Sequence, residues 1–363
     1  MKKIGIINSG GDCAGLNAVI SSLVKTGTPL GYVFYGFERG WEGLLDPMSY
    51  RVLDRSAVSG ISHLGGTILH TVNRGRFAGK VGSGDMSRID PEILAMAKKN
   101  AGKLGLDGFI VIGGDGTLSA ATQLSDYGLG VIGVPKTIDN DLGATDQTFG
   151  FSTAVQIAVD ALDKIHTTAT SHDRTFFVEC MGRHAGWISL FAGLAGSANA
   201  ILLPEFEFSL SNFIEYLRNR REAGDFSTVV VVAEGLKIEG IGQSKKRGAT
   251  SSEIVFGGAS EQLMHAIETV CPDEFEMRNV ILGHTQRGGS PNSADRILAK
   301  RYGAEAMLAY HRGDFGRMVA YRNNEMVTVP IAEAVKSLKL VTTGNYEYQT
   351  AKTIGTYLNG ARG

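Results

Sequence analysis

Short apolar runs recur along the chain and are separated by longer, more polar stretches. Five of these runs contain four to six residues each and are almost wholly apolar: Lys3–Ile7, Gly108–Ile112, Val131–Val134, Thr175–Val178 and Thr228–Ala233. A short apolar run bounded by turn-forming residues is typical of a buried strand. The pattern therefore predicts at least five buried strands, distributed from the N-terminus to the last third of the chain.

Most of the stretches between these runs have helical periodicity. Helices are expected over Leu16–Lys25, Pro91–Lys103, 258–270 and 292–312. The second of them has a proline near its start and a glycine near its end, as helices often do. Because strands and helices alternate, the sequence predicts an α/β fold with largely parallel sheets. In such folds, ligands bind at the carboxyl ends of the strands.

The last third of the chain has the least regular pattern. In the helix expected there, Ile297, Ala304 and Leu308 predict the apolar stripe that faces the core. Two short strands are expected after this helix, near 317–321 and 325–330. The tail beyond Thr343 is polar and predicts no particular element.

Composition narrows the class of protein. A chain of 363 residues is long for one core, so two domains are expected. Its net charge of −1 provides no basic field, and nucleic acid is not an expected partner. No apolar run approaches the length of a membrane span and no secretion leader precedes the first strand, so a cytoplasmic protein without membrane contact is expected. Cys13, Cys180 and Cys271 lack the spacing of a zinc site.

Glycine-rich turns follow the first two predicted strands. The turn Asn8–Gly15 leads from a strand into a helix, and the turn Gly113–Thr117 does the same. A strand, a glycine turn and a helix together form a typical phosphate site, because main-chain N–H groups and the helix N-terminus point at the anion. The first turn has the spacing of neither of the two common nucleotide-binding motifs, and an ordinary structural turn is its alternative interpretation. Asp115 suits a Mg²⁺ ion carried by a nucleotide, since Mg²⁺ prefers one or two carboxylates plus phosphate oxygens.

An acidic turn, Pro135–Asp141, follows the third predicted strand. Its carboxylates, Asp139 and Asp141, are separated by one residue and come just past the strand end, where α/β sheets bind ligands. An ordinary Asx-rich turn is the alternative interpretation of this stretch. Further along the chain, charged residues again lie beside glycines at strand ends, at Arg183, Glu234 and Arg287.

Five of these motifs together closely resemble those of the 6-phosphofructokinase family, over nearly the whole chain. They occur in family order and at family spacing: Ser9–Asp12, Gly113–Gly116, Thr137–Asp141, Met181–Arg183 and Gly283–Pro291. The resemblance implies a phosphofructokinase-like fold of two Rossmann-like three-layer α/β domains, each discontinuous in sequence. Residues 1–150 plus 286–336 would form the phosphoryl-donor domain, and residues 151–285 plus 337–363 the sugar-phosphate domain.

The resemblance also implies an activity. The family transfers the γ-phosphoryl group of MgATP to the 1-hydroxyl of D-fructose 6-phosphate in glycolysis, giving fructose 1,6-bisphosphate and ADP. Asp139 would take the hydroxyl proton, with Thr137 orienting nearby. Arg183 would stabilise the charge of the transferring group, and Gly11 would lie against it. Phosphoryl transfer depends mainly on positioning and charge neutralisation, which accounts for the many arginines and glycines.

Family positions further imply three sets of contacts. The ATP contacts would be Gly11, Arg74, Gly113, Asp115, Gly116, Thr117 and Lys136. The fructose 6-phosphate contacts would be Thr137, Asp139, Arg174, Met181, Gly182, Arg183, Glu234, Arg278, His284 and Arg287. The Mg²⁺ carboxylates would be Asp115 and Asp141. Arg174 and Arg278 would reach the sugar phosphate of a neighbouring subunit, so a homo-oligomer, dimer or tetramer, is expected. Around Arg74 the sequence departs from the family pattern by about one residue, which leaves Arg76 as the alternative.

Two positions give opposite indications of the phosphoryl donor. Gly116 resembles the ATP-using members, because the aspartate common in diphosphate-using members would repel the nucleotide α-phosphate. Lys136 resembles the diphosphate-using members. An aspartate at position 116 would oppose ATP by charge repulsion and overlap at close range, whereas an additional ammonium group at position 136 need not exclude ATP. ATP is therefore the expected donor. A diphosphate-dependent enzyme is the alternative. A non-catalytic regulatory subunit of the same fold is disfavoured by the presence of Asp115, Asp139 and Arg183.

Overall fold

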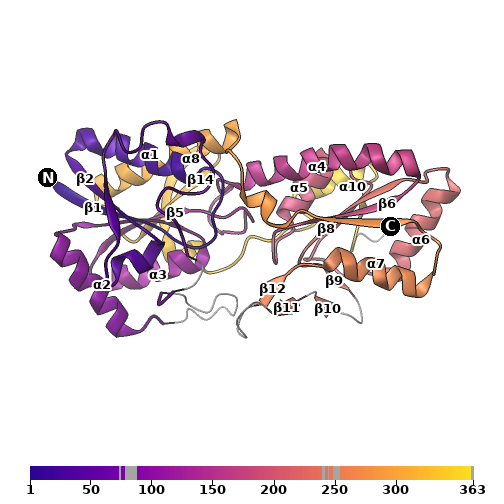
Figure 1. Ribbon diagram of the computed structural model, residues 1–363, viewed down its shortest axis with the longest axis horizontal. Helices are drawn as coiled ribbons and strands as arrows, with labels where there is room; N and C mark the ends of the chain where they lie inside the picture. Colours follow the sequence, from indigo (N-terminus) through magenta and orange to yellow (C-terminus); the bar gives the residue numbers. More distant parts are fainter. Residues whose placement is uncertain (73–74, 78–87, 239–241, 244, 248–253, 361–363) are drawn as a thin grey trace. The chain divides into compact units, whose positions relative to one another are not determined.

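The computed structural model describes residues 1–72, 75–77, 88–238, 242–243, 245–247 and 254–360. The chain forms two compact units (Figure 1). The first unit comprises Met1–Ile138, Leu142–Thr153 and Arg287–Leu338, and the second comprises Asp139–Asp141, Ala154–Gln286 and Lys339–Gly363. Within the described residues, no helix combines the length and the apolar character needed to cross a membrane.

A seven-stranded sheet forms the centre of the first unit. Its strand order is β15-β14-β5-β4-β1-β2-β3. The five inner strands are parallel, and the edge strands β3 and β15 run antiparallel to their neighbours. The strands are β1 (Lys2–Asn8), β2 (Tyr32–Phe37), β3 (Tyr50–Leu53), β4 (Gly108–Gly113), β5 (Gly130–Pro135), β14 (Arg317–Arg322) and β15 (Glu325–Pro330). The carboxyl ends of β1 and β4 therefore meet at one edge of the sheet.

Helices cover both faces of this sheet (Figure 1). They are α1 (Leu16–Gly27), α2 (Pro91–Leu104), α3 (Asp115–Asp126), α8 (Ser293–Arg312) and the short α9 (Ile331–Ala334), with single 3₁₀ turns at Thr28–Leu30, Gly40–Leu44 and Ile61–His63. On one face, Leu94 of α2 and Leu118 of α3 join Ile7 and Phe109 of the sheet in one apolar cluster. On the other, α1 and α8 pack so closely that a Cβ at Gly303 would lie 2.4 Å from the Val19 carbonyl oxygen.

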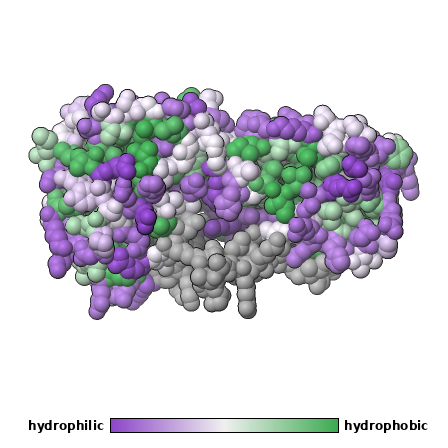
Figure 2. Space-filling view, viewed as in Figure 1, coloured by the Kyte–Doolittle hydropathy of each residue, from purple (hydrophilic) through white to green (hydrophobic). Residues whose placement is uncertain are grey.

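The predicted apolar stripe of α8 is wrong. Ile297 is 62% exposed and Leu308 is 38% exposed, whereas Tyr302 is fully buried. The buried face of this helix is built largely from alanine, glycine and tyrosine, and these residues give a weak signal in a hydrophobicity pattern. Apolar residues also reach the surface elsewhere, as separate patches among hydrophilic ones on the face shown in Figure 2.

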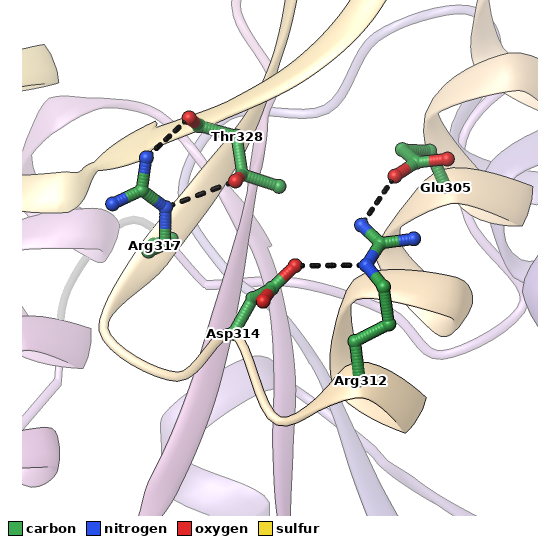
Figure 3. Close-up of polar contacts among 5 residues, drawn as sticks. All are labelled: Glu305, Arg312, Asp314, Arg317 and Thr328. Carbon is green, nitrogen blue, oxygen red and sulfur yellow. Dashed lines mark hydrogen bonds and ion pairs between the residues drawn. The ribbon is translucent and has the colours of Figure 1, made fainter.

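Two arginines order the connection from α8 to β14 (Figure 3). Arg312, in the last turn of α8, donates to Glu305 at 2.7 Å and to Asp314 at 3.0 Å. Arg317, the first residue of β14, donates to the Oγ1 atom of Thr328 at 2.9 Å and to its carbonyl oxygen at 2.6 Å. The first pair of contacts fixes the helix end, and the second ties β14 to β15.

The second unit contains a fully parallel five-stranded sheet of order β13-β6-β8-β7-β16. Its strands are β6 (Thr175–Cys180), β7 (Ala200–Leu202), β8 (Thr228–Ala233), β13 (Met277–Ile281) and β16 (Tyr357–Leu358). Two small antiparallel ribbons pair β9 (Lys237–Ile238) with β10 (Gly242–Gln243) and β11 (Lys245–Arg247) with β12 (Ile254–Phe256). Residues of β6 and β8 are all buried, as expected for central parallel strands.

In the described part of the second unit, the chain between and after these strands forms the helices α4 (Phe151–His172), α5 (Trp187–Ala195), α6 (Leu210–Glu222), α7 (Ala259–Val270) and α10 (Tyr346–Thr353). A 3₁₀ helix, η4, spans Gly283–Arg287. Phe213 of α6 and Leu263 of α7 pack with Phe177 and Val230 of the sheet in one apolar cluster. The tail beyond Thr343, for which the sequence predicts no element, supplies both α10 and the edge strand β16.

Candidate active site

In the first unit, the turn after β1 is surrounded by two cationic side chains. The Lys136 ammonium donates to the carbonyl oxygen of Gly11. The guanidinium of Arg287 donates to the carbonyl oxygen of Asp12 at 3.2 Å, and a Cβ at Gly11 would lie 2.8 Å from the Arg287 Nη1 atom. Gly10 has φ +84°, which glycine adopts readily and other residues do not. The turn thus brings Gly11, Lys136 and Arg287 together.

The second glycine turn joins β4 to α3. Helix α3 begins at Asp115, whose Oδ1 atom accepts the N–H of Gly116 at 2.8 Å. A Cβ at Gly113 would collide with the side chain of Thr117 at 2.3 Å, so only glycine fits there. The N–H of Lys136 donates to the Gly113 carbonyl oxygen at 2.9 Å and ties the ends of β4 and β5 together. Thr117, in the first turn of α3, lies against the β1 turn, since a Cβ at Gly10 would be 3.4 Å from the side chains of both Thr117 and Lys136. The positive end of the α3 dipole is therefore beside the β1 turn.

The acidic turn divides between the two units. Thr137 belongs to the first, where its carbonyl oxygen accepts the Thr148 hydroxyl at 2.6 Å. Asp139–Asp141 belongs to the second. Asp139 is only 5% exposed, and Asn140 has φ +52°. These residues form no helix or strand.

In the second unit, the turn after β6 is shaped around one carboxylate. Glu234, just past β8, accepts the N–H groups of Gly182 at 3.2 Å and Arg183 at 2.9 Å through its Oε1 atom. Burial raises the pKa of Glu234, the bond from Arg183 opposes that shift, and the nearby charge of Asp139 adds to it. The carboxyl groups of Glu234 and Asp139 and the main chain of Arg183 therefore lie in one neighbourhood.

Gln286 belongs to this turn as well, although the sequence assigned it no role. Its Oε1 atom accepts the N–H of Met181 at 2.8 Å, and the residue is buried. Gln286 lies in the Gly283–Pro291 motif between two residues with expected substrate contacts. Its function is to hold the main chain, which residue type and spacing alone do not reveal. His284, two residues earlier in η4, is exposed.

The two arginines expected to reach a neighbouring subunit converge on one carboxylate. Arg174 donates to the Oε1 atom of Glu276 at 2.6 Å, and Arg278 donates to the same oxygen at 3.0 Å. The hydrogen bond from Arg174 is the main cause that lowers the pKa of Glu276, and the charges of both arginines add to it. Two guanidinium groups can thus share a single anionic oxygen at this place.

The remaining expected positions are an arginine and the metal carboxylates. Arg74 lies outside the described residues, and Arg76 forms an ion pair with Glu42 at 3.0 Å. Nowhere in the described parts of the chain do three or more His, Cys, Asp or Glu side chains gather as a metal site. Asp115 is half-buried at the N-terminus of α3. A lone carboxylate beside a phosphate-binding turn fits Mg²⁺, which keeps waters and phosphate oxygens as its other ligands.

The fold is α/β, and its glycine turns at strand ends, two of them leading into helices, are typical of proteins that bind phosphate groups. The sequence matches the family model described as Phosphofructokinase over residues 3–310. The chain belongs to the phosphofructokinase family, as its motifs indicate.

Individual relatives agree with this placement. An ATP-dependent 6-phosphofructokinase of Chloroflexus aurantiacus is 47% identical, across 94% of this chain and 93% of its own length. A pyrophosphate–fructose 6-phosphate 1-phosphotransferase of Streptomyces coelicolor is 45% identical, across 95% of this chain and 98% of its own.

Among solved structures, Pichia pastoris phosphofructokinase in the T-state superposes with a TM-score of 0.78 at 30% identity. The match covers 92% of this chain but 35% of that longer one. The predicted phosphofructokinase-like α/β fold is confirmed.

Proposed function

We propose that this protein transfers the γ-phosphoryl group of MgATP to the 1-hydroxyl of D-fructose 6-phosphate, giving fructose 1,6-bisphosphate and ADP. The observation that carries the proposal is the pair of glycine turns after β1 and β4, with the cations of Lys136 and Arg287 against the first of them. The family and relatives named as ATP-dependent 6-phosphofructokinases support it. We assign donor binding to the first unit and sugar-phosphate binding to the second.

Charge neutralisation is the main task of the first unit in this proposal. The N–H groups at the start of α3 and the turn at Gly11 would bind donor phosphate oxygens. Arg287 is the cation of this unit that we assign to the sugar phosphate instead. Mg²⁺, when bound, would neutralise charge on the donor phosphates. Asp115 is the carboxylate that we assign to it, with Asp141 assigned to its waters.

Acceptor activation is the task of the second unit. Asp139 would accept the proton of the 1-hydroxyl group, and Thr137 would orient the acceptor. The Arg183 side chain would stabilise the charge on the transferring group, while Met181, Gly182, Glu234 and His284 complete the sugar-phosphate contacts. The support comes from the Glu234 carboxylate, which holds the Arg183 main chain and lies near Asp139.

Gly116 and Lys136 decide which donor we propose. Gly116 lies in the first turn of α3, where it brings no side chain toward a nucleotide α-phosphate. The Lys136 ammonium is bonded to the Gly11 carbonyl oxygen, a role that serves either donor by fixing the turn. Diphosphate is the second candidate, because a buried ammonium beside Gly10 could also hold a phosphate. Named relatives include enzymes of both donors.

A paired assay separates these possibilities. The purified protein is given fructose 6-phosphate and Mg²⁺ with either ATP or diphosphate, and fructose 1,6-bisphosphate is measured. Turnover with ATP is expected. Turnover with diphosphate alone would overturn the donor assignment. No turnover with either donor would overturn the catalytic proposal and favour a regulatory subunit.

The Asp139→Asn substitution tests the assigned base. It keeps the shape of the side chain and removes its capacity to take a proton, so kcat should fall by about 10²- to 10⁴-fold. The KM for ATP and the binding of fructose 6-phosphate, measured by calorimetry, should change little. Wild-type turnover in this variant would remove Asp139 as the base.

The active protein is proposed to be a cytoplasmic homo-oligomer, dimer or tetramer. Arg174 and Arg278 already share one anionic oxygen, which is the geometry needed to hold a phosphate dianion. In the proposal, they bind the sugar phosphate in the neighbouring subunit, so the oligomer is required for activity.

A further inference from the structure

We propose that Lys339 is a positioning residue that holds the Asp139–Asp141 segment in place for phosphoryl transfer. The proposal rests on the function assigned to Asp139 above. Lys339 lies in the same unit as Asp139–Asp141 but about two hundred positions away in sequence. It belongs to none of the motifs that carry the family resemblance.

Lys339 contacts this segment through both its main chain and its side chain. Its N–H donates to the Asp141 carbonyl oxygen at 2.8 Å. Its ammonium donates to the Asn140 Oδ1 atom at 3.1 Å. The two bonds are made to the two residues that follow Asp139, one at the Asn140 side chain and one at the Asp141 main chain. Together they restrain the segment directly after the proposed base.

Trp187 in turn holds Lys339. The indole N–H donates to the Lys339 carbonyl oxygen at 2.8 Å, and the ammonium lies 5.5 Å from the centre of the indole ring. Trp187 is buried and begins α5, and a cation near an aromatic face is attracted by the ring. Lys339 is therefore fixed at its N–H, its carbonyl oxygen and its ammonium.

The acidic segment needs an external restraint of this kind. Asp139–Asp141 forms no helix or strand of its own, and Asn140 adopts a left-handed conformation, which asparagine tolerates better than most non-glycine residues but which still costs free energy. Such a conformation persists only where surrounding bonds impose it. Because proximity effects are steep, a displacement of about 1 Å at a reacting group can lower a rate by about 10²-fold.

The chain after Lys339 links this restraint to the turn that carries Arg183. The N–H of Val341 donates to the Glu205 Oε1 atom at 3.0 Å, and the N–H of Gly186 donates to the same atom at 2.8 Å. Gly186 is the residue before α5 and ends the turn that Arg183 begins. The segment Lys339–Val341 thus connects two groups of the proposed acceptor site, the base and the arginine.

The test replaces Lys339 with Met, which keeps an unbranched stem over Trp187 and removes the ammonium. The expected result is a fall in kcat of about 10- to 100-fold, with the KM for ATP unchanged. Lys339→Arg retains a cationic donor and should restore most of the turnover. Lys336→Met is the matched control, because Lys336 is an exposed lysine three residues earlier. It should have wild-type kinetics.

A double-mutant cycle distinguishes positioning from general stability. If Lys339 acts through Asp139, then Lys339→Met should lower kcat in the wild-type background and have little further effect in the Asp139→Asn background. Equal losses in both backgrounds, or wild-type turnover of Lys339→Met, would overturn the proposal. The base assignment is tested separately, by the single variant Asp139→Asn. If that variant keeps wild-type turnover, Asp139 is not the base, and the proposed role of Lys339 is overturned with it.

Trp187→Phe provides a second variant should Lys339→Met fold poorly. It removes the indole N–H that holds the Lys339 carbonyl oxygen and leaves the lysine itself in place. A smaller fall in kcat is expected, again absent in the Asp139→Asn background, with a melting temperature close to that of the wild type. Additive losses in this cycle would contradict the proposal as well.

Discussion

Arg183 adopts a left-handed backbone conformation, with φ +50°, in the turn after β6. Two consecutive residues after β8 impose it. Glu234 accepts the Arg183 N–H, and Gly235 leaves room for the Arg183 carbonyl oxygen, which would lie only 1.7 Å from a Cβ at that position. No side chain larger than hydrogen can occupy position 235 unless the main chain of Arg183 moves.

The Gly235→Ala substitution should therefore damage the site through the backbone. We expect kcat/KM for fructose 6-phosphate to fall by about 10²-fold, because the Arg183 main chain must shift. The KM for ATP should change much less. Gly102→Ala in α2 is the control, since a Cβ there meets nothing within 4 Å and should add about 0.5–1 kcal/mol of stability. A Gly235→Ala enzyme with wild-type kinetics would contradict this account.

Candidate site residues are easier to predict from the sequence than the residues that hold their main chain. Asp115, Asp139 and Arg183 stand at strand ends beside glycines, where the pattern itself indicates a ligand. Gln286 and Lys339 act on main-chain groups of residues distant in sequence, and any polar residue on a loop has the same local pattern. Their positions become apparent only when the fold brings the segments together.

At the scale of elements, a carboxylate from the first turn of α8 caps the N-terminus of α4. Asn292 accepts the N–H of Asp295 at 2.9 Å and caps α8. The Asp295 carboxylate accepts both the N–H of Thr153 at 2.7 Å and its hydroxyl at 2.6 Å, in the first turn of α4. Asp295 is fully buried, and burial raises its pKa although the bonds from Thr153 oppose the shift.

The raised pKa of Asp295 gives a signed prediction for pH. The folded state holds the Asp295 proton more tightly than the unfolded state, so this residue's contribution to stability falls as pH rises from about 4, its unfolded pKa, through the folded pKa. Asp295→Asn lacks that titration. The free energy of unfolding of the variant minus that of the wild type should therefore increase with pH over this window, as measured by denaturant titration. A difference that decreases with pH would contradict the assignment.

The elements themselves are largely predictable from the sequence, and the tail is the instructive exception. The strands near 108–112, 175–178 and 228–233 are uniformly apolar and were recognisable as buried. The tail was not, because β16 has only two residues and depends on Asn359. That buried amide accepts the Leu203 N–H at 2.7 Å and donates to the carbonyl oxygens of Leu203 and Phe206. A strand of two residues is too short to leave a periodic signal in the sequence.

At the scale of the whole molecule, the proposed assembly rests on the Arg174–Glu276–Arg278 cluster. Both arginines are partly exposed and share the Glu276 carboxylate within one chain. Exposed ion pairs of this kind contribute little to stability. Breaking the two pairs with Glu276, so that the arginines bind a phosphate dianion instead, would therefore cost little free energy. This arrangement suits side chains that serve a site in a neighbouring subunit.

Mixed oligomers test that arrangement directly. Subunits carrying Asp139→Asn and subunits carrying Arg174→Ala with Arg278→Ala should each be nearly inactive alone. After denaturation and joint refolding, random pairing should restore about a quarter of wild-type activity, because each hybrid pair regains one intact site. Activity that stays at the level of the separate variants would show that the arginines serve the site of their own subunit.

The order of the chain has a consequence for synthesis on the ribosome. Strand β5 ends at Pro135, but its neighbour in the sheet, β14, begins only at Arg317. At ordinary elongation rates, roughly 10 to 40 s pass between the emergence of the two strands. During that interval most of the second unit, up to Gln286, is translated, while the outer edge of β5, at Ile132 and Gly133, has no partner strand. The nascent first unit thus carries a temporary unpaired edge, the kind of surface on which chaperones act in the cell.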